Sequence, residues 1–517
     1  GLGSIPSGLT RKPTLARSIG ITLDHTSRTP LYQQIASEIS SRIRSGAMPT
    51  GFRLPPTRQL AAELDTHRNT IVRAYEELGS AGLLQSTVGR GTFVQAPAQK
   101  EGSPVEVPER RPHPWGSLMS RAASSETLRR ADRLRAAPSS RDEVNLTSMQ
   151  PPPELRPHEQ LRRCLDHVLR TRGPRALGYA PRGGVPQLRE LIAADLSAGG
   201  VPATHEDVLI TTGSQQALDL IARALINDGD TFLVDESTYT GAINLLTAAG
   251  ARLTGVPSDA EGPDPNALRR LVGSGAKGFY LMPNCGNPTG RCISAVRRRA
   301  LVEWSHEANV PLIEDDYGAD LNMDGVRPPP ALRALDSQVI YVGTFSKKLI
   351  PALRVGFMVC PREMRKHLLP LKHAMDLGTS AVLQYALAEF IERGYLRSHI
   401  ARTQVVYRER RDALCDALTK YMPEGVRWER PGRGLVLWLE LDDPLTPEAV
   451  FEAARRRGVL VTPGHLNSPQ AQAQGGLRLV FCAEPPDRLA EGAKRLGQAI
   501  TDVRAGPQGQ TYAIDTV

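Results

Sequence analysis

Two adjacent lysines in the stretch GTFSKKLIPALRVGF (343–357) are the first residues of this sequence that point to chemistry. Lysine is scarce in the chain, since only 9 of its 64 basic residues are lysines. Lys347 and Lys348 follow a Ser/Thr-rich turn, and Arg354 lies seven residues beyond Lys347. A lysine amine can form a Schiff base with a carbonyl compound, whereas a guanidinium stays protonated. The stretch therefore raises the question of which lysine reacts, and with what.

A second set of residues is suited to hold a phosphate. In TTGSQQALDL, a strand end and a glycine turn lead into a helix, and backbone N–H groups at a helix start attract anions. Hydroxyl groups and an arginine on other loops would complete such a site. The candidates are Gly213, Ser214, Gln215, Thr344, Ser346 and Arg354. A Gly-Ser turn by itself is weak evidence, because serine also caps helices for local reasons.

A third set is suited to hold a conjugated ring. A carboxylate keeps a ring nitrogen protonated, and IEDDYG, which follows a strand-like segment, offers Asp315 and Asp316. Asn287 and Tyr317 can donate to a phenolate oxygen, and Tyr239 can stack on the ring face. Together with Lys347, these are the groups that pyridoxal 5'-phosphate (PLP) requires. Each has an ordinary structural explanation alone, but their occurrence together favours a PLP site.

These residues must be positioned by an α/β fold. Beyond residue 144, short apolar runs alternate with helical patterns, which predicts a mainly parallel sheet covered on both faces. Ligands of such sheets bind beyond the carboxyl ends of the strands, where the candidates fall. The strand candidates are DVLITT, TFLVDE, ARLTGVP, GFYLMP, PLIEDD, VIYVGT and VGFMVC.

Residues from about 144 to 500 resemble the fold-type-I, aspartate-aminotransferase-like enzymes, whose motifs occur here in the same order. The resemblance implies that Lys347, and not Lys348, forms the Schiff base with PLP. It assigns Asp315 to the ring nitrogen and gives the other candidates the roles stated above. Tyr179, in LGYAPRGG, matches a tyrosine that reaches the phosphate of the partner subunit. Arg478, in GGLRLVF, matches an arginine that pairs with a substrate carboxylate.

The first hundred residues predict a small helical domain. Apolar residues spaced four apart over 31–43 predict one helix, and a second is expected over 57–64. A third helix starts at HRNT and is expected to end at Gly79 and Gly82. LLQSTVGRGTFV then alternates and turns at 89–91, as in a hairpin. Three helices followed by a hairpin indicate a winged helix-turn-helix.

Polar residues of this domain stand where DNA contact needs them. The start of a recognition helix reaches base edges, and a glycine-flanked hairpin tip can approach the backbone. The candidates are Arg58, Arg68, Asn69, Thr70, Arg73, Gly89, Arg90, Gly91 and Thr92. Any one of them could be ordinary surface. Residues 30–94, with LPPTRQLAAELDTHRNTIVRAYEELGSAGLL and GRGTFV, resemble the GntR family of winged-helix regulators, which implies contact with double-stranded DNA.

The chain is therefore expected to be a multidomain protein. The expected parts are a disordered tail or cloning remnant (1–24), the winged helix-turn-helix domain (25–95), a Pro/Arg-rich linker (96–143), the aminotransferase-like domain (144–505) and a C-terminal tail (506–517). A short helix is expected within the linker, around 124–136. The first hundred residues carry a net charge of +6 of the total +9, as expected for a nucleic-acid-binding part.

Composition argues against several other classes. No apolar run is long enough to span a membrane. The six cysteines are scattered without a CxxC pair, which argues against a zinc site or a disulfide framework and fits a reducing cytoplasm. Cys164 and His167 lie close together in CLDH, but no second ligand pair accompanies them, so no metal is expected.

The combination of both parts resembles the MocR/GabR family of regulators from about residue 30 to 498. The resemblance implies a domain-swapped homodimer that binds a DNA operator. It predicts a PLP-dependent regulator that senses PLP itself, or an amino-bearing effector, through the Schiff base of Lys347, with the effector's carboxylate on Arg478. An active aminotransferase with an accessory DNA-binding domain stays open as the alternative, because fold alone does not exclude turnover.

Two stretches depart from the family pattern. Pro-Asn-Cys-Gly (283–286) precedes the NPTG turn, where many relatives have a Ser-His-Gln-like stretch. Glu-Ser-Thr (236–238) precedes Tyr239, where a proline and a glycine are usual. Both stretches are expected to line the effector pocket, which predicts an unusual effector.

Overall fold

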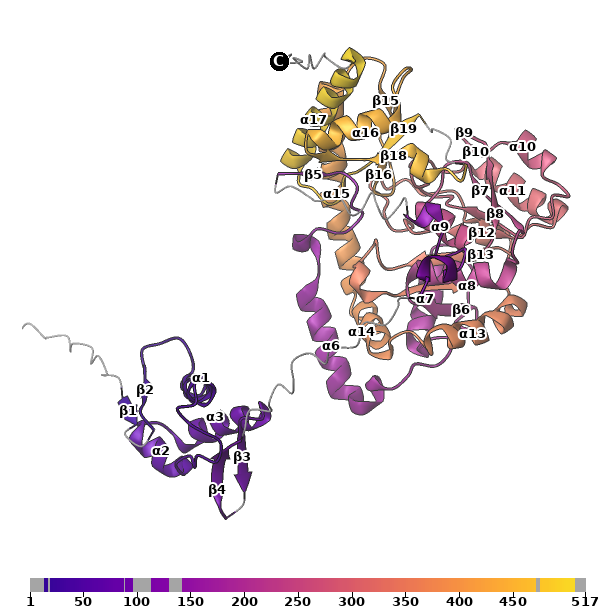
Figure 1. Ribbon diagram of the computed structural model, residues 1–517. Helices are drawn as coiled ribbons and strands as arrows, with labels where there is room; N and C mark the ends of the chain where they lie inside the picture. Colours follow the sequence, from indigo (N-terminus) through magenta and orange to yellow (C-terminus); the bar gives the residue numbers. More distant parts are fainter. Residues whose placement is uncertain are drawn as a thin grey trace, which may run out of the picture. The chain divides into compact units, whose positions relative to one another are not determined.

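The computed structural model of the chain describes residues 14–16, 19–87, 89–95, 113–129, 142–470 and 475–506. Its contacts divide into an N-terminal unit, Gly1–Trp115, and a C-terminal unit, Gly116–Val517 (Figure 1). The two units have separate hydrophobic cores. Within the described ranges, no helix has both the length and the apolar character needed to cross a bilayer.

The N-terminal unit is the predicted winged helix-turn-helix. Its helices are α1 (Leu31–Arg44), α2 (Thr57–Glu63) and α3 (Arg68–Ser80), and its wing strands are β3 (Leu84–Thr87) and β4 (Gly91–Val94). Ile35, Ile39 and Ile43 of α1 are buried, as their four-residue spacing predicted. They pack with Ile71 and Leu78 of α3 in one core. The apolar faces of these helices therefore hold the unit together.

One expectation about this unit was wrong. Residues 14–23 contain a small hairpin of β1 (Thr14–Ala16) and β2 (Ile21–Leu23), although 1–24 was expected to be a tail. Ile21 and Leu23 are completely buried in the core of the unit. A three-residue strand is too short to show a period in the sequence. Helix α3 ends at Ser80, between the two glycines that were expected to end it, and Gly82 has a φ of +71° just beyond the cap.

Most of the expected linker and both expected chain ends fall outside the described residues. The ranges concerned are 1–13, 17–18, 96–112, 130–141 and 507–517. Of the linker, a short helix α4 (Trp115–Leu118) and a helical turn over 126–129 are described. The turn lies inside the range 124–136 where a helix was expected.

The C-terminal unit is built around a seven-stranded sheet with the order β6-β14-β13-β12-β11-β7-β8 (Figure 1). Only β14 runs antiparallel to its neighbours, β13 and β6. All seven predicted strands are present: β6 (Val208–Thr211), β7 (Thr231–Asp235), β8 (Arg252–Val256), β11 (Phe279–Leu281), β12 (Leu312–Asp315), β13 (Ile340–Thr344) and β14 (Gly356–Val359). Strands β6, β11, β12, β13 and β14 are buried along their whole length, as expected for a sheet covered on both faces.

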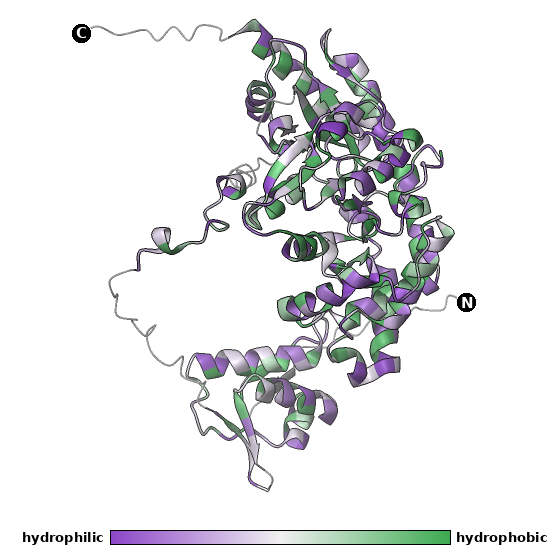
Figure 2. Ribbon diagram, turned by 90° about the vertical axis from the view of Figure 1, so that its right-hand side faces the viewer, coloured by the Kyte–Doolittle hydropathy of each residue, from purple (hydrophilic) through white to green (hydrophobic). Residues whose placement is uncertain are grey.

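Helices and short connections surround this sheet. They are η1 (Pro153–Leu155), α6 (His158–Arg172), η2 (Gly173–Leu177), α7 (Pro186–Ala198), α8 (Gly213–Leu225), α9 (Thr240–Ala248), α10 (Pro265–Arg270), α11 (Ala295–Ala308), α12 (Leu332–Leu335), η3 (Pro351–Leu353), α13 (Arg362–Asp376) and α14 (Ala381–Glu392), with a small ribbon of β9 (Ser258–Asp259) and β10 (Gly262–Pro263). The helices carry both hydrophobic and hydrophilic residues, so that an apolar side of each can pack against the sheet or a neighbouring helix (Figure 2).

A smaller subdomain follows the long helix α15 (Tyr395–Tyr421). It holds an antiparallel sheet of order β15-β16-β19-β18, formed by β15 (Arg427–Trp428), β16 (Val436–Glu440), β18 (Thr462–Pro463) and β19 (Gly476–Val480). The other elements are α16 (Pro447–Arg456), η4 (Gly464–Asn467), α17 (Pro486–Ala505) and the parallel pair β5 (Val144–Asn145) and β17 (Val459–Leu460). This subdomain brings β19 into the site described next.

Candidate functional site

Lys347 lies just beyond β13 and is largely withdrawn from solvent. Its Nζ atom is 3.4 Å from the carbonyl oxygen of Met149, to which it donates. Burial lowers the pKa of the Lys347 amine, and the positive charges of Arg478 and Arg354 act in the same direction. A lowered pKa increases the fraction of neutral amine, which is the form that attacks an aldehyde. The environment of Lys347 therefore suits Schiff-base chemistry.

Asp315, the last residue of β12, has one satisfied and one unsatisfied carboxylate oxygen. The hydroxyl of Tyr280 on β11 donates to its Oδ2 at 2.7 Å. Its Oδ1 is buried and has no hydrogen-bond partner among the described residues. Burial raises the pKa of Asp315 to about 6, although the Tyr280 bond acts in the opposite direction. A buried oxygen without a donor is unfavourable, so this position fits a protonated ring nitrogen.

The turn that starts α8 has the shape of an anion site. Gly213 has a φ of +76°, and a Cβ atom there would lie 2.6 Å from Nη2 of Arg354, so only glycine fits. Ser214 and Gln215 fall in the first turn of the helix, where backbone N–H groups have no partner within the helix. Arg354 donates to the Pro351 carbonyl oxygen at 3.5 Å, and it forms no ion pair with an acidic side chain that the structure describes. A guanidinium above such a turn suits a phosphate.

The end of β13 lies next to this turn, because β13 and β6 are both paired with β14. Thr344 and Ser346 are buried there. The backbone N–H of Ser346 donates to Oγ1 of Thr344 at 3.1 Å, which fixes the bend into Lys347. The structure thus gathers the predicted phosphate residues at one edge of the sheet.

Arg478 on β19 meets the NPTG loop. Its Nη1 donates to Oδ1 of Asn287 at 3.1 Å, and its Nη2 donates to Thr462 Oγ1 at 3.2 Å and to the Thr147 carbonyl oxygen at 3.3 Å. Its Nε is buried without a partner, and no acidic side chain of the described ranges lies within ion-pair distance of its guanidinium. Burial lowers the pKa of Arg478. A buried guanidinium without a carboxylate is a suitable place for an anionic ligand.

Two tyrosines complete the predicted ring site. Tyr239 precedes α9, and its hydroxyl donates to Oε1 of Gln215 at 3.3 Å. This bond links Tyr239 to the turn at Gly213–Gln215, which is called the phosphate turn below. The hydroxyl of Tyr317 is buried and has no hydrogen-bond partner that the structure describes, so it can donate to a ligand oxygen. Burial raises its pKa and keeps it in the neutral, donating form.

The unusual stretch 283–286 packs against this ring site. Cys285 is buried between two glycines: a Cβ on Gly318 would lie 2.1 Å from the Cys285 Sγ, and one on Gly434 would lie 3.0 Å from its Cβ. Burial raises the pKa of the Cys285 thiol, which stays protonated. In the other unusual stretch, the Ser237 and Thr238 hydroxyls are buried without partners within the described ranges. Both stretches therefore shape the surroundings of Tyr317 and Tyr239.

The structure does not bring Tyr179 into this site. Its side chain is 81% exposed, in the loop between η2 and α7. Its expected contact with a partner subunit stays a prediction.

The sequence did not reveal three residues that contact the site: Met149, Tyr280 and Thr462. The carbonyl oxygen of Met149 faces Lys347, and its sulfur is 3.9 Å from both Asn287 Nδ2 and Arg478 Nη1. Tyr280 contacts Asp315 from the neighbouring strand, and Thr462 contacts Arg478 from β18. Tyr280 is an aromatic residue in a predicted strand, which is a visible signal, but the neighbour of that strand cannot be identified from the sequence.

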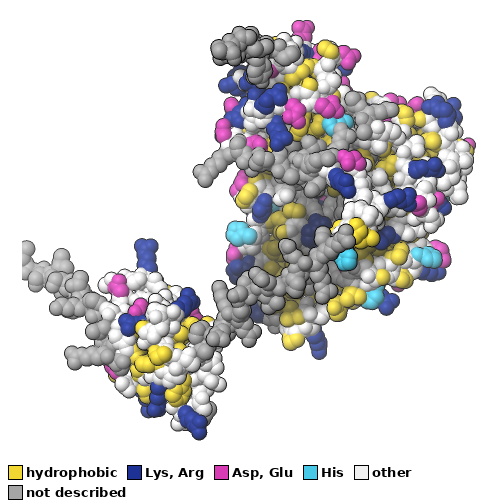
Figure 3. All heavy atoms as spheres, viewed as in Figure 1, with side chains coloured by type: hydrophobic (Ala, Val, Ile, Leu, Met, Phe, Trp, Pro, Cys, Tyr) yellow, Lys and Arg dark blue, Asp and Glu magenta, His cyan; other side chains and the backbone are white. Residues whose placement is uncertain are grey.

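The predicted DNA-contacting residues lie on the surface of the N-terminal unit. Arg58 is on α2, Arg68, Asn69 and Thr70 start α3, Arg73 follows one turn later, and Gly89, Arg90, Gly91 and Thr92 form the wing tip. The four arginines are exposed, and none forms an ion pair with a described acidic residue. Figure 3 shows Lys and Arg side chains projecting from this unit.

Two local contacts orient this surface. The guanidinium of Arg73 lies 3.9 Å from the ring centroid of Tyr32. Arg53, which the sequence analysis overlooked, lies beside the wing, since a Cβ on Gly91 would be 3.1 Å from its Nε. Arg53 also forms a bridge with Phe93, so its backbone adds to the wing sheet. Basic side chains on a helix start and a wing suit the DNA backbone and base edges.

The described residues offer no metal site. No group of three or more His, Cys, Asp or Glu side chains in those ranges is arranged to hold a metal ion. All six cysteines are unpaired.

Comparison with known proteins agrees with this division. Residues 31–94 match the bacterial regulatory proteins of the gntR family, and residues 141–496 match aminotransferase class I and II. The probable rhizopine catabolism regulatory protein MocR of Rhizobium meliloti is 30% identical over 93% of this chain and 95% of its own length. The uncharacterized HTH-type transcriptional regulator YdfD of Bacillus subtilis is 28% identical over 92% of this chain and 97% of its own.

Enzymes resemble the C-terminal unit alone. The 2-aminoadipate transaminase of Thermus thermophilus is 34% identical over 69% of this chain and 89% of its own length. The crystal structure of LysN, an alpha-aminoadipate aminotransferase of T. thermophilus complexed with N-(5'-phosphopyridoxyl)-L-leucine, has a TM-score of 0.69 and 32% identity, over 76% of this chain and 99% of that chain. The chain therefore belongs to the MocR-type regulators, in which a GntR-type DNA-binding domain is joined to a PLP-dependent domain of aminotransferase class I and II.

Proposed function

We propose that the protein is a transcriptional regulator whose C-terminal unit senses PLP or an amino-bearing effector, and whose N-terminal unit responds with altered DNA binding. The observation that carries this proposal is the buried Arg478 guanidinium, which has no carboxylate partner among the described residues and contacts Asn287 beside Lys347. Such a group is suited to bind the carboxylate of an amino acid. It would place the amino group of the effector toward Lys347.

The residues fit the cofactor that the family uses. Asp315 would hold the ring nitrogen through its unsatisfied Oδ1, Tyr317 would donate to the phenolate oxygen, and the turn at Gly213 with Arg354 would hold the phosphate. When bound, PLP supplies an aldehyde that reacts with amines and a ring that withdraws electrons. Lys347 supplies the amine of this chain, and its lowered pKa favours the neutral form.

Sensing requires that the ligand prefer one conformation of the protein. The site is made by two parts: Lys347, Asp315 and Gly213 belong to the large sheet, whereas Arg478 belongs to the smaller antiparallel sheet. A ligand that contacts both parts stabilises the arrangement in which they are close together. Only such a difference in affinity can shift the equilibrium between two states. We infer that this closure changes how the N-terminal unit binds DNA.

The test measures binding of the full-length protein to its own upstream DNA by fluorescence anisotropy, with PLP and with a panel of amines and amino acids. The expected result is an affinity that changes with PLP or with one amine in the wild type, and that no longer responds in Lys347→Ala. The sensing proposal would be contradicted if the protein carries bound PLP and binds DNA in a salt-sensitive way, but none of these compounds alters its DNA affinity.

A second candidate function is amino-group transfer. It is favoured by the complete set of Lys347, Asp315 and Arg478, and by the similarity to a 2-aminoadipate transaminase. Activity and DNA-binding assays on one protein preparation distinguish the two candidate functions. Steady conversion of an amino donor and a keto acid, without sequence-selective DNA binding, would support the enzyme, whereas DNA binding that responds to an amine without turnover would support the regulator.

A further inference from the structure

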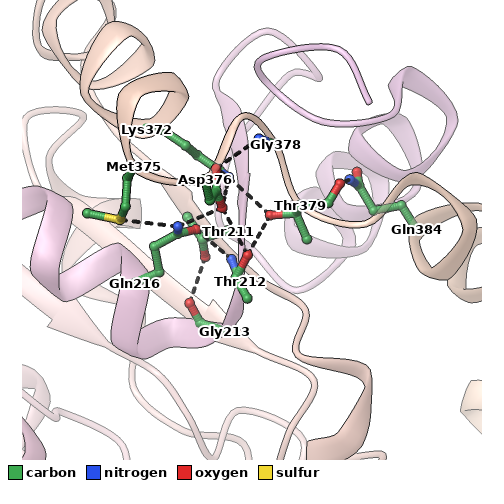
Figure 4. A network of polar contacts seen from close by, with 10 residues as sticks. All are labelled: Thr211, Thr212, Gly213, Gln216, Lys372, Met375, Asp376, Gly378, Thr379 and Gln384. Carbon is green, nitrogen blue, oxygen red and sulfur yellow. Dashed lines mark hydrogen bonds and ion pairs between the residues drawn. The ribbon is translucent and has the colours of Figure 1, made fainter. Parts of the chain in front are cut away.

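A buried ion pair lies directly beside the turn that we assign to the phosphate. Lys372 of α13 is only 1% exposed, and its Nζ donates to Asp376 Oδ1 at 3.0 Å and to Oδ2 at 2.9 Å (Figure 4). It also donates to Oγ1 of Thr379 at 3.1 Å. Neither residue belongs to the site derived above. A buried lysine is unfavourable unless it is paired, so the position calls for an explanation.

Asp376 connects this pair to the start of α8. Its Oδ2 accepts from the Thr212 hydroxyl at 3.1 Å and from Gln216 Nε2 at 2.7 Å. The Oε1 atom of the same Gln216 accepts from the Thr212 backbone N–H at 2.7 Å. The Thr212 hydroxyl also contacts that of Thr379 at 3.0 Å. Asp376 thus holds the two residues that flank the Gly213–Gln215 turn, and Figure 4 shows them converging on its carboxylate.

The same carboxylate creates an electrostatic problem for a phosphate. Asp376 is ionised, because hydrogen bonds from Gln216 and Lys372 outweigh burial and lower its pKa. It is the last residue of α13, where the helix dipole adds further negative potential. A negative charge beside an anion site repels the anion, and in a partly buried place this repulsion is weakly screened. The turn therefore needs a positive charge that cancels that of Asp376.

We propose that Lys372 is a positioning residue for the cofactor phosphate: it neutralises Asp376, so that this carboxylate can orient the phosphate-binding turn without repelling the phosphate. Asp376 fixes the position of the turn through its hydrogen bonds with Thr212 and Gln216. Lys372 compensates the negative charge of Asp376, which would otherwise repel the phosphate. The inference rests on the placement of PLP described under the proposed function, and it assigns a role to a pair that would otherwise only stabilise the fold.

The network also reaches the loop that carries Tyr179. Gln384 of α14 donates to the Thr379 carbonyl oxygen at 2.9 Å, and its Oε1 accepts from the Val185 N–H at 2.8 Å. A Cβ on Gly378 would lie 3.5 Å from the Ala180 carbonyl oxygen. The network around the ion pair therefore extends from the Gly213–Gln215 turn, through Thr379 and Gln384, to Val185.

The experiment compares PLP with pyridoxal, which has the same ring and aldehyde but no phosphate. Dissociation constants of the full-length protein for both compounds are measured by absorption titration, without DNA. In Lys372→Met we expect about a tenfold or larger loss of PLP affinity, because an uncancelled carboxylate then faces the phosphate, and little change for pyridoxal. In Lys372→Met/Asp376→Asn most of the lost PLP affinity should return, because the second substitution removes the repelling charge.

A purely structural role predicts another pattern. If the pair only stabilises α13, Lys372→Met weakens PLP and pyridoxal by the same factor, and Asp376→Asn does not restore PLP binding; either result overturns the proposal. Should Lys372→Met fail to fold, Lys372→Gln decides, because it keeps a hydrogen-bond donor for Asp376 but removes the positive charge. The ratio of PLP to pyridoxal affinity must then fall below that of the wild type, and an unchanged ratio in the folded variant refutes the role.

The outcome is separable from that of the proposed regulation. These titrations report only on the cofactor phosphate, and DNA is absent. A regulator that responds to an effector could still lack this role of Lys372. Conversely, a phosphate effect of Lys372 would stand if the protein proved to be an aminotransferase.

Discussion

Lys347 and Lys348 are consecutive residues, yet their amino groups occupy opposite electrostatic environments. The Nζ of Lys347 donates to the Met149 carbonyl oxygen, and burial lowers its pKa, with the charges of Arg478 and Arg354 acting in the same direction. The Nζ of Lys348 forms an ion pair of 2.6 Å with Asp320, and this carboxylate outweighs burial and raises its pKa. The chain thus separates a reactive amine from a structural ammonium group within two residues.

This contrast predicts which substitution abolishes cofactor attachment. Lys347→Ala should lose the near-ultraviolet to blue absorption of bound PLP, because the substitution removes the amine that would form the Schiff base. Lys348→Ala should keep the absorption but lose about 1–3 kcal/mol of unfolding free energy, since Asp320 is left without its partner. Spectra and urea unfolding of both variants test this. Retained absorption in Lys347→Ala, or its loss in a folded Lys348→Ala, would contradict the assignment.

Replacing Asp315 is expected to raise the stability of the cofactor-free protein and to weaken PLP binding. Its pKa is raised to about 6, so above that pH the folded protein holds a buried ionised carboxylate at a cost in stability. Asp315→Asn should therefore raise the unfolding free energy of the cofactor-free protein at pH 8 by about 1–3 kcal/mol, and leave it nearly unchanged at pH 4, where the carboxyl is protonated in the folded state.

The same substitution should weaken PLP binding. Above about pH 6 the ionised Asp315 can pair with a protonated ring nitrogen, and below that pH the pairing is lost. PLP affinity of the wild type should rise from pH 5 to pH 7 more steeply than that of Asp315→Asn. The variant serves as the control for the ionisation of the phosphate itself, which occurs in the same range. Parallel pH profiles would exclude this role.

Arg478 should determine whether the effector needs a carboxylate. Arg478→Gln removes the charge but keeps a hydrogen-bond donor, and we expect about a tenfold to hundredfold loss of affinity for amino acids. Amines without a carboxylate should bind the variant and the wild type alike. Isothermal titration with matched pairs, such as an amino acid and its decarboxylated amine, measures the difference. Equal losses for both members of a pair would mean that Arg478 supports the pocket and not the carboxylate.

The exposed arginines should divide into sequence readers and phosphate binders. Arg68→Ala at the start of α3 should relax sequence preference and cost about 1–3 kcal/mol. Arg90→Ala at the wing tip should weaken all sequences alike and reduce the slope of affinity against salt by about one unit. Arg223→Ala, on α8 in the other unit, is the control for lost net charge. A uniform effect of all three would argue against a specific docking surface.

The exposure of Tyr179 predicts a site shared between two subunits. We expect a dimer by light scattering and weakened PLP binding in Tyr179→Ala. Mixed dimers of Tyr179→Ala with Lys347→Ala should recover one functional site, because one subunit supplies the tyrosine and the other the lysine. Recovery is read from the absorption of the bound cofactor relative to the parent dimers. A monomer, or mixed dimers without recovery, would place Tyr179 outside the cofactor site.

Much of the architecture follows from local patterns of the sequence. Five strands of the large sheet (β6, β11, β12, β13 and β14) are buried along their whole length, and burial on both faces requires short continuous apolar runs, so these strands were predictable. The helix faces of the winged domain follow from the spacing of Ile35, Ile39 and Ile43. The positions of Lys347 and Asp315 at the ends of strands were predictable, because both follow or close apolar runs that read as strands.

Short or non-periodic segments were not predictable. The hairpin of β1 and β2 has strands of three residues, which carry no readable period. Met149 lies in a loop without a motif, and its contact with Lys347 joins residues 198 positions apart. The donation of Tyr280 to Asp315 depends on the order of strands in the sheet, which local sequence does not encode.

By itself the sequence determined the chemical groups of the site and their order along the chain, because these depend on residue type and on local strand and helix patterns. Only the tertiary structure decided their states: among the described residues one oxygen of Asp315 has no partner, Arg478 contacts Asn287 and no carboxylate, and Lys372 pairs with Asp376 beside the turn that starts α8. Burial and the charges of distant segments set these states, and both arise only when the chain is folded.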